Sequence, residues 1–563
     1  MHGVVWEAKM GFNIGDILQG EILDFTHEGN GVLKVNNFTF FIPNGVIGDK
    51  VEFKITELKK NFGIGSIVNL IEPSKDRVID MDIESGEIPL INYDYKKQLE
   101  WKKHKVEMDL MKFAGLSNIN INDTIAMDNP YRYRNHTQIP VGNKNGKTVI
   151  GFYAKGSHDV VDMRDSILQP EIADEILNVI REWINKCNIK PYDSKSNKGE
   201  LKHIGIRTNI DNQAMVIMVT ATDYLPKSDE LIKMLKSEVK EVISIYHNIN
   251  NMKSAPTYGR KYIKLYGEDR LIDYLGKFKF KISPNSFFQV NRTQAEILYD
   301  KAIEFLDLHS EDEVFDIYCG IGTISLYIAN KAKKVYGIES VKSAIDDAKE
   351  NAMLNNIDNV EFIVGKAEEV FPKLTNEGVR GNKVVVDPPR KGCEKEVLEA
   401  IVKLNPERVV YVSCNPTTMA RDVKYLLDNG YEIKEVQPVD MFPHTSNVET
   451  VVSLSHKNAD SHINVNVEFG DEEGQIPIDE IARKAEEYRP SERVTYKIIQ
   501  EYIENKYNFK VHTAYIAEVK RDLGLPMYDA PNTVEELKQE RKHPTPEKVE
   551  AIKDALRHFG VIQ

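Results

Sequence analysis

The 563-residue sequence contains few cysteines, namely Cys187, Cys319, Cys393 and Cys414, and no two are spaced as a C-x-x-C pair. This excludes a disulfide framework and argues against a zinc or iron–sulfur knuckle, so we expect no metal site. The chain also lacks a run of about 18 uncharged apolar residues, and its start lacks the apolar segment of a secretory signal. We therefore expect a cytoplasmic protein with no membrane partner.

An excess of positive charge is also missing. The chain has 74 Lys and Arg against 87 Asp and Glu, a net charge of -13. This balance argues against a protein that is basic throughout and binds nucleic acid by bulk charge, although it leaves room for local basic patches. At about 150 residues per domain, the length predicts three to four domains.

The first predicted domain spans residues 11–70. Five short runs of Val, Ile, Phe and Leu are separated by Gly and Asn, a pattern typical of a small OB-like β-barrel. Exposed lysines would suit an oligonucleotide partner, and a solvated barrel with scattered lysines is the alternative. Residues 1–9 fit neither pattern, so translation could start at Met1 or at Met10. The lysines are Lys34, Lys54, Lys59 and Lys60.

Three further regions follow. Residues 71–282 are predicted to form a mixed α+β central domain. It includes an amphipathic helix over 93–115, with Leu99, Val106, Leu110 and Phe113 on one face, that we expect to pack on the next domain. Residues 283–457 alternate strands and helices with short links, which predicts a Rossmann-like, doubly wound α/β domain. Residues 458–563 are predicted to form a helical extension.

The α/β region has the features of a cofactor site. Gly320 and Gly322 lie between a strand and a helix, Glu339 closes the next strand and Asp387 closes a later one. Acidic side chains at these positions can accept the ribose hydroxyls of an adenosine cofactor. Position 325 is Ser where a dinucleotide fingerprint has its third glycine, so S-adenosylmethionine fits better than NAD.

Cys414 is the candidate nucleophile. It ends the predicted strand RVVYVSC and precedes a helix. The positive end of a helix dipole lowers a thiol pKa, so we expect a reactive thiolate here. A buried, inert cysteine is the alternative reading of an isolated Cys.

Five motifs occur in one order: FFQVN at 287–291, DIYCGIGT at 316–323, DPPRKG at 387–392, SCNP at 413–416 and MFPHTSNVETV at 441–451. Together they resemble the family of S-adenosylmethionine-dependent RNA uracil-5-methyltransferases, and the first domain resembles the TRAM module of its 23S ribosomal RNA branch. The resemblance covers residues 11–457 and makes 283–457 the methyltransferase domain. It implies that Gln289, Tyr318, Glu339 and Asp387 bind the cofactor, with Cys414 as nucleophile and Glu449 as base.

These two roles agree with the chemistry. Carbon 5 of uracil becomes nucleophilic when a thiolate adds to carbon 6, and a base must then remove the hydrogen from carbon 5. Glu449 could instead be a strand glutamate paired with a lysine. Many relatives bind an iron–sulfur cluster, but here the stretch before Tyr93 has no cysteine and Ser166 stands where the fourth ligand would fall, so we expect no cluster.

The expected partner is structured RNA, 23S ribosomal RNA by the TRAM-like module, with transfer RNA as the alternative, and we expect a monomer. Phe287 or Phe288 could stack on a flipped base, or both could be core aromatics. The candidate phosphate contacts are Arg132, Arg134, Arg260, Lys261, Lys264, Arg390 and Lys391, unless these belong to solvated faces.

Two other functions compete with this one. An RNA-binding or assembly factor with a vestigial methyltransferase domain would not need Cys414 and Glu449. An amino-group methyltransferase would place an aromatic residue where Arg390 stands. The tail contains helices that resemble a helix-turn-helix, but residues 459–563 hold 21 acidic against 15 basic residues, which disfavours phosphate contact.

Overall fold

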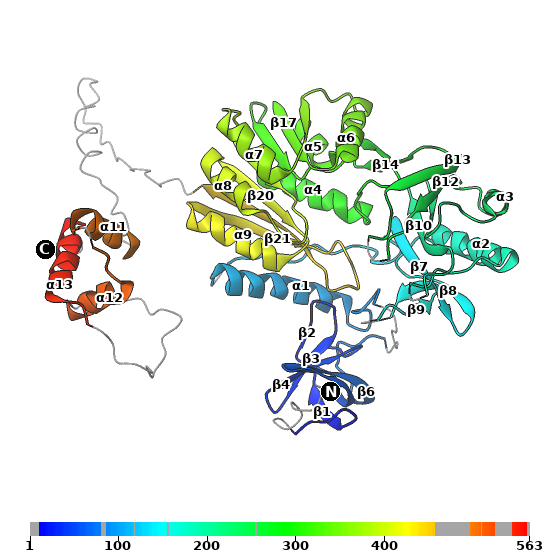
Figure 1. Cartoon of the computed structure of the whole chain (residues 1–563), viewed down its shortest axis with the longest axis horizontal. Helices are drawn as coiled ribbons and strands as arrows, with labels where there is room; N and C mark the ends of the chain where they lie inside the picture. The colour runs from blue at the N-terminus through cyan, green and yellow to red at the C-terminus, as the bar shows by residue number, and fades with distance from the viewer. Residues whose placement is uncertain are drawn as a thin grey trace, which may run out of the picture. The chain divides into compact units, whose positions relative to one another are not determined.

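The computed structural model describes residues 11–79, 86–117, 119–154, 157–194, 196–253, 256–456, 496–507, 509–523 and 543–559. Figure 1 shows the chain, which divides into two compact units, residues 1–461 and 462–563. The question of the start residue, Met1 or Met10, lies outside the described residues. Among the described helices, none is long and apolar enough to cross a membrane.

The N-terminal domain is a six-stranded sheet with the order β1-β5-β6-β4-β3-β2. Its strands alternate inward and outward residues, so that Phe38, Phe40 and Ile42 of one strand face the core. Lys34, Lys54, Lys59 and Lys60 are exposed. The strands are β1 Ile17–Glu21, β2 Asp24–Phe25, β3 Gly31–Val35, β4 Phe38–Ile42, β5 Lys50–Leu58 and β6 Phe62–Glu72.

The predicted helix over 93–115 is α1 Tyr95–Asp109, continued by one π-helical turn, η1 Leu110–Ala114. The Asp94 side chain caps it by accepting a hydrogen bond from the backbone N–H of Lys97. Val106 and Leu110 are buried against the α/β domain as expected. Phe113 is 37% exposed, contrary to the predicted stripe, because the wider π turn rotates it away from the buried face.

The central domain is built on a seven-stranded sheet with the order β13-β12-β11-β10-β7-β8-β9. Strand β11 is apolar throughout because both faces are covered: Val216 and Met218 pack with the helices of this domain, while Met215 and Ile217 join the core of the next domain. The elements are β7 His136–Lys144, β8 Lys147–Tyr153, β9 Val160–Asp162, α2 Glu171–Cys187, β10 Leu201–Thr208, β11 Ala214–Thr220, α3 Ser228–Glu238, β12 Val242–Ile249 and β13 Lys261–Gly267.

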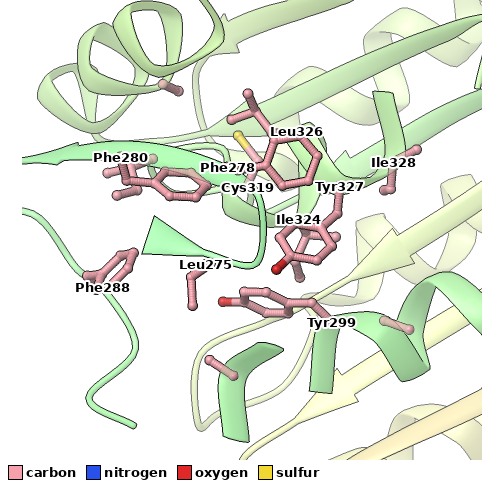
Figure 2. Close-up of a cluster of buried hydrophobic side chains, with 14 of the residues drawn as sticks. Leu275, Phe278, Phe280, Phe288, Tyr299, Cys319, Ile324, Leu326, Tyr327 and Ile328 are labelled. Carbon is pink, nitrogen blue, oxygen red and sulfur yellow. The ribbon is translucent and has the colours of Figure 1, made fainter. Parts of the chain in front are cut away.

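A hairpin, β14 Leu271–Leu275 and β15 Phe278–Ile282, leads into the α/β domain. Figure 2 shows its aromatic side chains packed against helices α4 (Arg292–Leu306) and α5 (Thr323–Ala329): the Phe278 and Tyr327 rings lie 4.8 Å apart, and the Tyr299 and Tyr327 rings 5.7 Å apart. Phe280 and Phe288 extend this cluster. The hairpin thereby fixes the chain that follows it, residues 283–291, which carries the FFQVN motif.

The α/β domain has a seven-stranded sheet with the order β18-β17-β16-β19-β20-β22-β21, in which only β22 is antiparallel to its neighbours. Helices α4, α5 and α6 cover one face, and α1, α7, α8 and α9 cover the other (Figure 1). The elements are α4 Arg292–Leu306, β16 Glu313–Ile317, α5 Thr323–Ala329, β17 Lys334–Glu339, α6 Lys342–Leu354, β18 Val360–Val364, α7 Ala367–Asn376, β19 Lys383–Val386, α8 Lys395–Leu404, β20 Arg408–Ser413, α9 Pro416–Asp428, β21 Tyr431–Val439 and β22 Glu449–His456. This confirms the predicted α/β fold class.

The second unit contains three described helices, α11 Tyr496–Tyr507, α12 Thr513–Asp522 and α13 Pro546–His558. They share an apolar core that includes Ile503, Ile516 and Ile552. The structure therefore contains a helical extension, as the sequence predicts.

Candidate active site

The chain order of the α/β domain changes direction between β16 and β19, which are neighbours in the sheet. The connections run outward from this point on both sides, so a crevice forms at the carboxyl ends of the strands. Tyr318, Glu339, Asp387 and Cys414 all lie at this edge, because each closes or follows a parallel strand. Glu449 joins them because β22 is antiparallel, so its first residue lies where the other strands end.

The loop after β16 shapes a narrow cavity. Tyr318, Gly320 and Gly322 have φ angles of 72°, 57° and 82°, in the region that favours glycine. The backbone N–H groups of Tyr318 and Cys319 donate to the Ile338 carbonyl at 2.9 and 3.0 Å, which holds the loop over the end of β17. A Cβ at Gly322 would lie 2.9 Å from the Phe362 ring, so this position must be glycine.

Gln289, Tyr318, Gly320 and Asp387 line this cavity of about 40 Å³ together with Phe287. Gly322 caps α5 beside it. Glu339 is not part of the lining: its carboxylate accepts hydrogen bonds from the Ser340 hydroxyl and the Val341 N–H at 2.9 and 2.8 Å.

The cavity has an acidic character. Burial raises the pKa of Asp387 to about 7, with nearby Asp316 adding to the rise. Asp316 is fully buried, and burial raises its pKa to about 7 although the Ser325 hydroxyl donates to it. Carboxyls held in this way favour a cationic or hydroxyl-bearing ligand, so the residues present fit a sulfonium cofactor that carries a ribose.

Cys414 and Glu449 face each other across two strands. The last paired residues of β20 and β22 are Ser413 and Thr450, so the next position along the ladder sets Cys414 opposite Glu449. Directly opposed residues in an antiparallel pair have Cβ atoms about 5 Å apart. The cysteine is free and half-buried. The structure thus brings together the thiol and the carboxyl that are 35 positions apart in the sequence.

The expected low thiol pKa is wrong for the free protein. Burial, together with the nearby Glu449 and Asp387 carboxylates, raises the pKa of Cys414 to about 11, while Arg390 opposes the rise. The helix that follows, α9, has its first N–H groups capped by the Asn415 side chain, which accepts from Thr417 N–H at 3.2 Å. Desolvation and two neighbouring carboxyls therefore outweigh the helix dipole.

Glu449 is 4% exposed, and it is not the half-exposed, lysine-paired glutamate of the alternative reading. Burial raises its pKa to about 8, Asp387 adds to the rise and Arg390 lowers it. The Arg390 backbone is tied to the cysteine loop, because its carbonyl accepts from the Asn415 side-chain amide at 2.9 Å and from the Thr418 hydroxyl at 3.2 Å. A carboxyl with this pKa changes protonation near neutral pH, as a proton-transferring group requires.

Helix α1 holds the loop that precedes Glu449. Its Lys102 is fully buried, forms an ion pair with Asp440 and donates to the Phe442 carbonyl at 3.1 Å. The Gln98 side chain accepts from the His444 N–H at 3.1 Å. From the N-terminal domain, the His27 carbonyl accepts from the Ser446 hydroxyl at 2.6 Å. The loop is thus fixed by two other domains.

The two phenylalanines of the FFQVN motif have different environments. Phe288 is 3% exposed and belongs to the core, while Phe287 is 68% exposed. Phe287 lines the narrow cavity and also a larger cavity of about 480 Å³. Of these two phenylalanines, Phe287 is therefore the one whose ring is available for stacking.

The arginines and lysines predicted to contact RNA also have different environments. Arg132 is held by Asp165, Asp174 and Glu171 at 3.2 to 3.6 Å, so its charge is already matched and we no longer assign it to RNA. Arg134 lines the larger cavity, and Arg390 is exposed beside Cys414 and Glu449. Of the remaining candidates, Arg260 and Lys261 are exposed, while Lys264 and Lys391 form ion pairs with Asp269 and Glu394.

The place expected for an iron–sulfur cluster has a different chemistry. The Ser166 hydroxyl donates to the Glu87 carboxyl at 2.8 Å, and burial raises the pKa of Glu87 to about 7. The four cysteines are free, and the described part of the chain has no group of three or more His, Cys, Asp or Glu side chains that could hold a metal ion. The residues present do not fit a cluster.

Sequence reasoning missed several of these groups. Lys102 and Gln98 are four residues apart and continue to the buried Val106, a spacing that marks one helix face. Asp316 lies between the apolar residues Phe315 and Ile317 of β16, which is the signal of a buried acid. Both patterns are present in the sequence. They indicate a buried charged residue only when the partner that such a residue requires is also known.

The fold and the acidic cavity at the strand-order reversal define a methyltransferase of the Rossmann-like class. Family comparison extends this: the tRNA (Uracil-5-)-methyltransferase model matches residues 94–457, and the TRAM domain model matches residues 13–68. The chain belongs to the tRNA (uracil-5-)-methyltransferase family. It is an S-adenosylmethionine-dependent RNA methyltransferase, which confirms the family, enzyme class, cofactor and RNA substrate class predicted from the motifs.

Similar proteins support this assignment. An uncharacterized RNA methyltransferase of Clostridium tetani is 46% identical over 433 residues, covering 76% of this chain and 94% of its own. One from Oceanobacillus iheyensis is 44% identical over 454 residues, covering 80% and 99%. The Pyrococcus abyssi tRNA (uracil-54, C5)-methyltransferase, solved with S-adenosyl-L-homocysteine, is 29% identical with a TM-score of 0.64, covering 77% of this chain and 99% of that structure.

Proposed function

We propose that the enzyme methylates carbon 5 of a uridine in structured RNA, most simply 23S ribosomal RNA, through a covalent bond between the Cys414 sulfur and carbon 6 of the ring. The observation that carries the proposal is the pairing of Cys414 with Glu449 close to Asp387, which lines the acidic cavity. A vestigial domain would have no reason to keep both groups together. An amino-group methyltransferase would need no thiol there.

The cofactor residues proposed are Gln289, Tyr318, Gly320, Gly322, Glu339 and Asp387. When bound, S-adenosylmethionine supplies an electrophilic methyl group on a positively charged sulfur. The carboxyl of Asp387 can accept hydrogen bonds from hydroxyls, and Tyr318 and Gly320 form one wall of the cavity. Gly322 leaves room for the Phe362 ring behind that wall.

The Cys414 thiol gives its proton to water, and the thiolate adds to carbon 6 of uracil. This addition makes carbon 5 an enolate carbon, which takes up the methyl group. Arg390, which favours the thiolate electrostatically, lies where it can stabilise the added negative charge. Because the free thiol has a raised pKa, the thiolate forms efficiently only when a cation enters the site.

Glu449 then removes the remaining hydrogen from carbon 5 as a proton. The electron pair of that bond restores the ring double bond and expels the Cys414 thiolate. A pKa of about 8 lets Glu449 accept this proton and release it to water in the next cycle. Phe287 stacks on the flipped base in this proposal, and Arg134 and Arg390 contact the RNA.

Two substitutions test the mechanism. Cys414→Ala should abolish methylation while S-adenosylhomocysteine still binds, and Cys187→Ala, which changes a half-buried cysteine of the central domain, serves as the control. Glu449→Gln should accumulate an RNA–protein adduct that survives a denaturing gel, because methyl transfer can occur but release cannot. Methylation by the Cys414→Ala protein would disprove the covalent route.

The substrate is tested separately. The TRAM domain favours ribosomal RNA, whereas the similar Pyrococcus abyssi enzyme is named for transfer RNA. Mass-spectrometric mapping of 5-methyluridine in ribosomal and transfer RNA from a deletion strain should show loss at a 23S position. Loss confined to transfer RNA would replace the ribosomal assignment with the alternative.

A further inference from the structure

The larger cavity, of about 480 Å³, lies between the central sheet and the loop 283–291. It shares Phe287 and Phe288 with the cofactor cavity, while neither Cys414 nor Glu449 lines it. A cavity of this size suits a ligand as large as a nucleotide. It is therefore a second compartment next to the reaction site.

Arg207, at the end of β10, is the unusual group in its wall. Only 4% of the residue is exposed, and its guanidinium donates to the Ser286 carbonyl. Among the described residues, no carboxylate lies within ion-pair distance of it and its Nε has no hydrogen-bond partner. Arg181, which is 8% exposed, shows the usual arrangement, with Asp162 at 2.7 Å.

A buried guanidinium without a carboxylate is costly, and an anion from outside the chain would compensate it. Two more residues that line the cavity each have a buried polar atom without a partner in the described structure, Nε of Arg134 and Oγ of Thr137. Thr137 is 5% exposed. Three unsatisfied groups around one cavity indicate a polar, negatively charged ligand.

The same wall offers flat surfaces. The His136 and Tyr258 rings stack with an interplanar angle of 7°, and the His136 Nε2 and Tyr258 hydroxyl lie 3.1 Å apart. Phe287 is exposed on the side shared with the cofactor cavity. A nucleobase stacks on such rings without regard to its identity.

We infer that this cavity binds the nucleotide next to the target uridine, with its phosphodiester against Arg207 and Arg134 and its base against the His136 and Tyr258 rings. This rests on the proposed function, because the target base itself must reach Cys414. RNA is favoured over a free phosphate compound because the cavity adjoins the site where the neighbouring base reacts. The phosphate contact fixes the strand while the target base is turned into the site.

The test measures binding and needs no turnover. Arg207→Gln should weaken the anisotropy-measured affinity for a fluorescent oligouridylate about tenfold and reduce the dependence of log Kd on log salt by about 0.7, the loss of one phosphate contact. The Kd for S-adenosylhomocysteine should not change, and the melting temperature without RNA should be equal or higher, because an uncompensated charge is removed. A purely structural arginine would instead lower the melting temperature and leave the salt dependence unchanged.

Arg380→Gln is the matched control, since this exposed arginine precedes β19 at the opposite edge of the sheet. Arg207→Lys serves if the glutamine variant fails to fold; it should weaken binding while retaining the salt dependence. Unchanged affinity in a folded Arg207 variant overturns the inference. So does uridine 5′-monophosphate or inorganic phosphate binding as tightly as the oligouridylate. Loss of the covalent mechanism in the Cys414 tests would leave these binding results standing.

Discussion

The carboxylate of Glu449 should suppress the reactivity of Cys414 in the free enzyme. Burial raises the pKa of the thiol from 9.0 to about 11, and Glu449 is the next largest cause. A rise of this size corresponds to about a hundredfold less thiolate at a given pH. Glu449→Gln removes the charge and keeps the side-chain shape, so it isolates the electrostatic part of the rise.

The expected effect depends on pH. Glu449 has a pKa of about 8, so below that pH it is mainly neutral and the substitution should change little. Above it, removal of the charge should increase the thiolate fraction by about tenfold if it causes half of the logarithmic rise. Because a thiolate of lower pKa is a weaker nucleophile, the alkylation rate should rise by about threefold.

The assay is iodoacetamide labelling of Cys414, followed by peptide mass spectrometry at a series of pH values. Cys187 in the same digest reports general accessibility, and Glu435→Gln, which changes an exposed strand carboxylate, is the matched control. Equal labelling of the wild-type and Glu449→Gln proteins above the pKa of Glu449 would refute the placement of its charge beside the thiol.

Two further predictions concern stability. Lys102→Met leaves Asp440 buried without its cation and should lower the free energy of unfolding by about 3 to 5 kcal/mol in urea melts. The Lys102→Met/Asp440→Leu double variant should recover most of this loss. An equal loss in both variants would show that the ion pair is not responsible. Burial raises the pKa of Glu449 from 4.5 to about 8, so the stability linked to its proton is present below pH 4.5 and is lost as the pH rises through 8. The Glu449→Gln protein should therefore gain stability relative to wild type as the pH rises over this range, by up to about 5 kcal/mol, in thermal melts below pH 4.5 and above pH 8. A difference in stability between the two proteins that does not change with pH would contradict the raised pKa.

Much of the candidate site could be predicted because its residues lie at the ends of strands. Cys414 and Asp387 follow apolar strands directly, and parallel strands end at one edge, so local pattern suffices to bring them together. Glu449 needed the motif, because an antiparallel strand places its beginning there and periodicity does not reveal strand direction. The electrostatics could not be predicted: the helix after Cys414 suggested a low thiol pKa, and only the packing shows that burial dominates.

The sequence predicted least well the polar residues whose partners lie far away along the chain. Lys102 appears solvent-facing in the sequence because its partner Asp440 is 338 positions away. Arg207 gives no local sign of its burial. The charge of the tail is unevenly distributed: residues 459–495 hold ten acidic and four basic residues, whereas residues 496–563, which contain the three helices, hold eleven of each. The acidic excess therefore lies outside the described helices and does not argue against phosphate contact by them.

The two cavities beside Phe287 share one electrostatic principle with opposite signs. Around the narrow cavity, burial raises the pKa values of Asp316, Asp387 and Glu449, and Arg390 offsets this rise only partly and only at Glu449; a bound sulfonium would bring a further cation. Around the larger cavity, Arg207 lacks an anion, and RNA brings one. Each wall is therefore destabilising while its ligand is absent, and part of the binding free energy comes from compensating that charge. In the proposed arrangement the methyl donor binds at the acidic cavity and an RNA phosphate at the basic one, so the arrangement that costs stability also keeps these two groups in separate cavities beside Phe287.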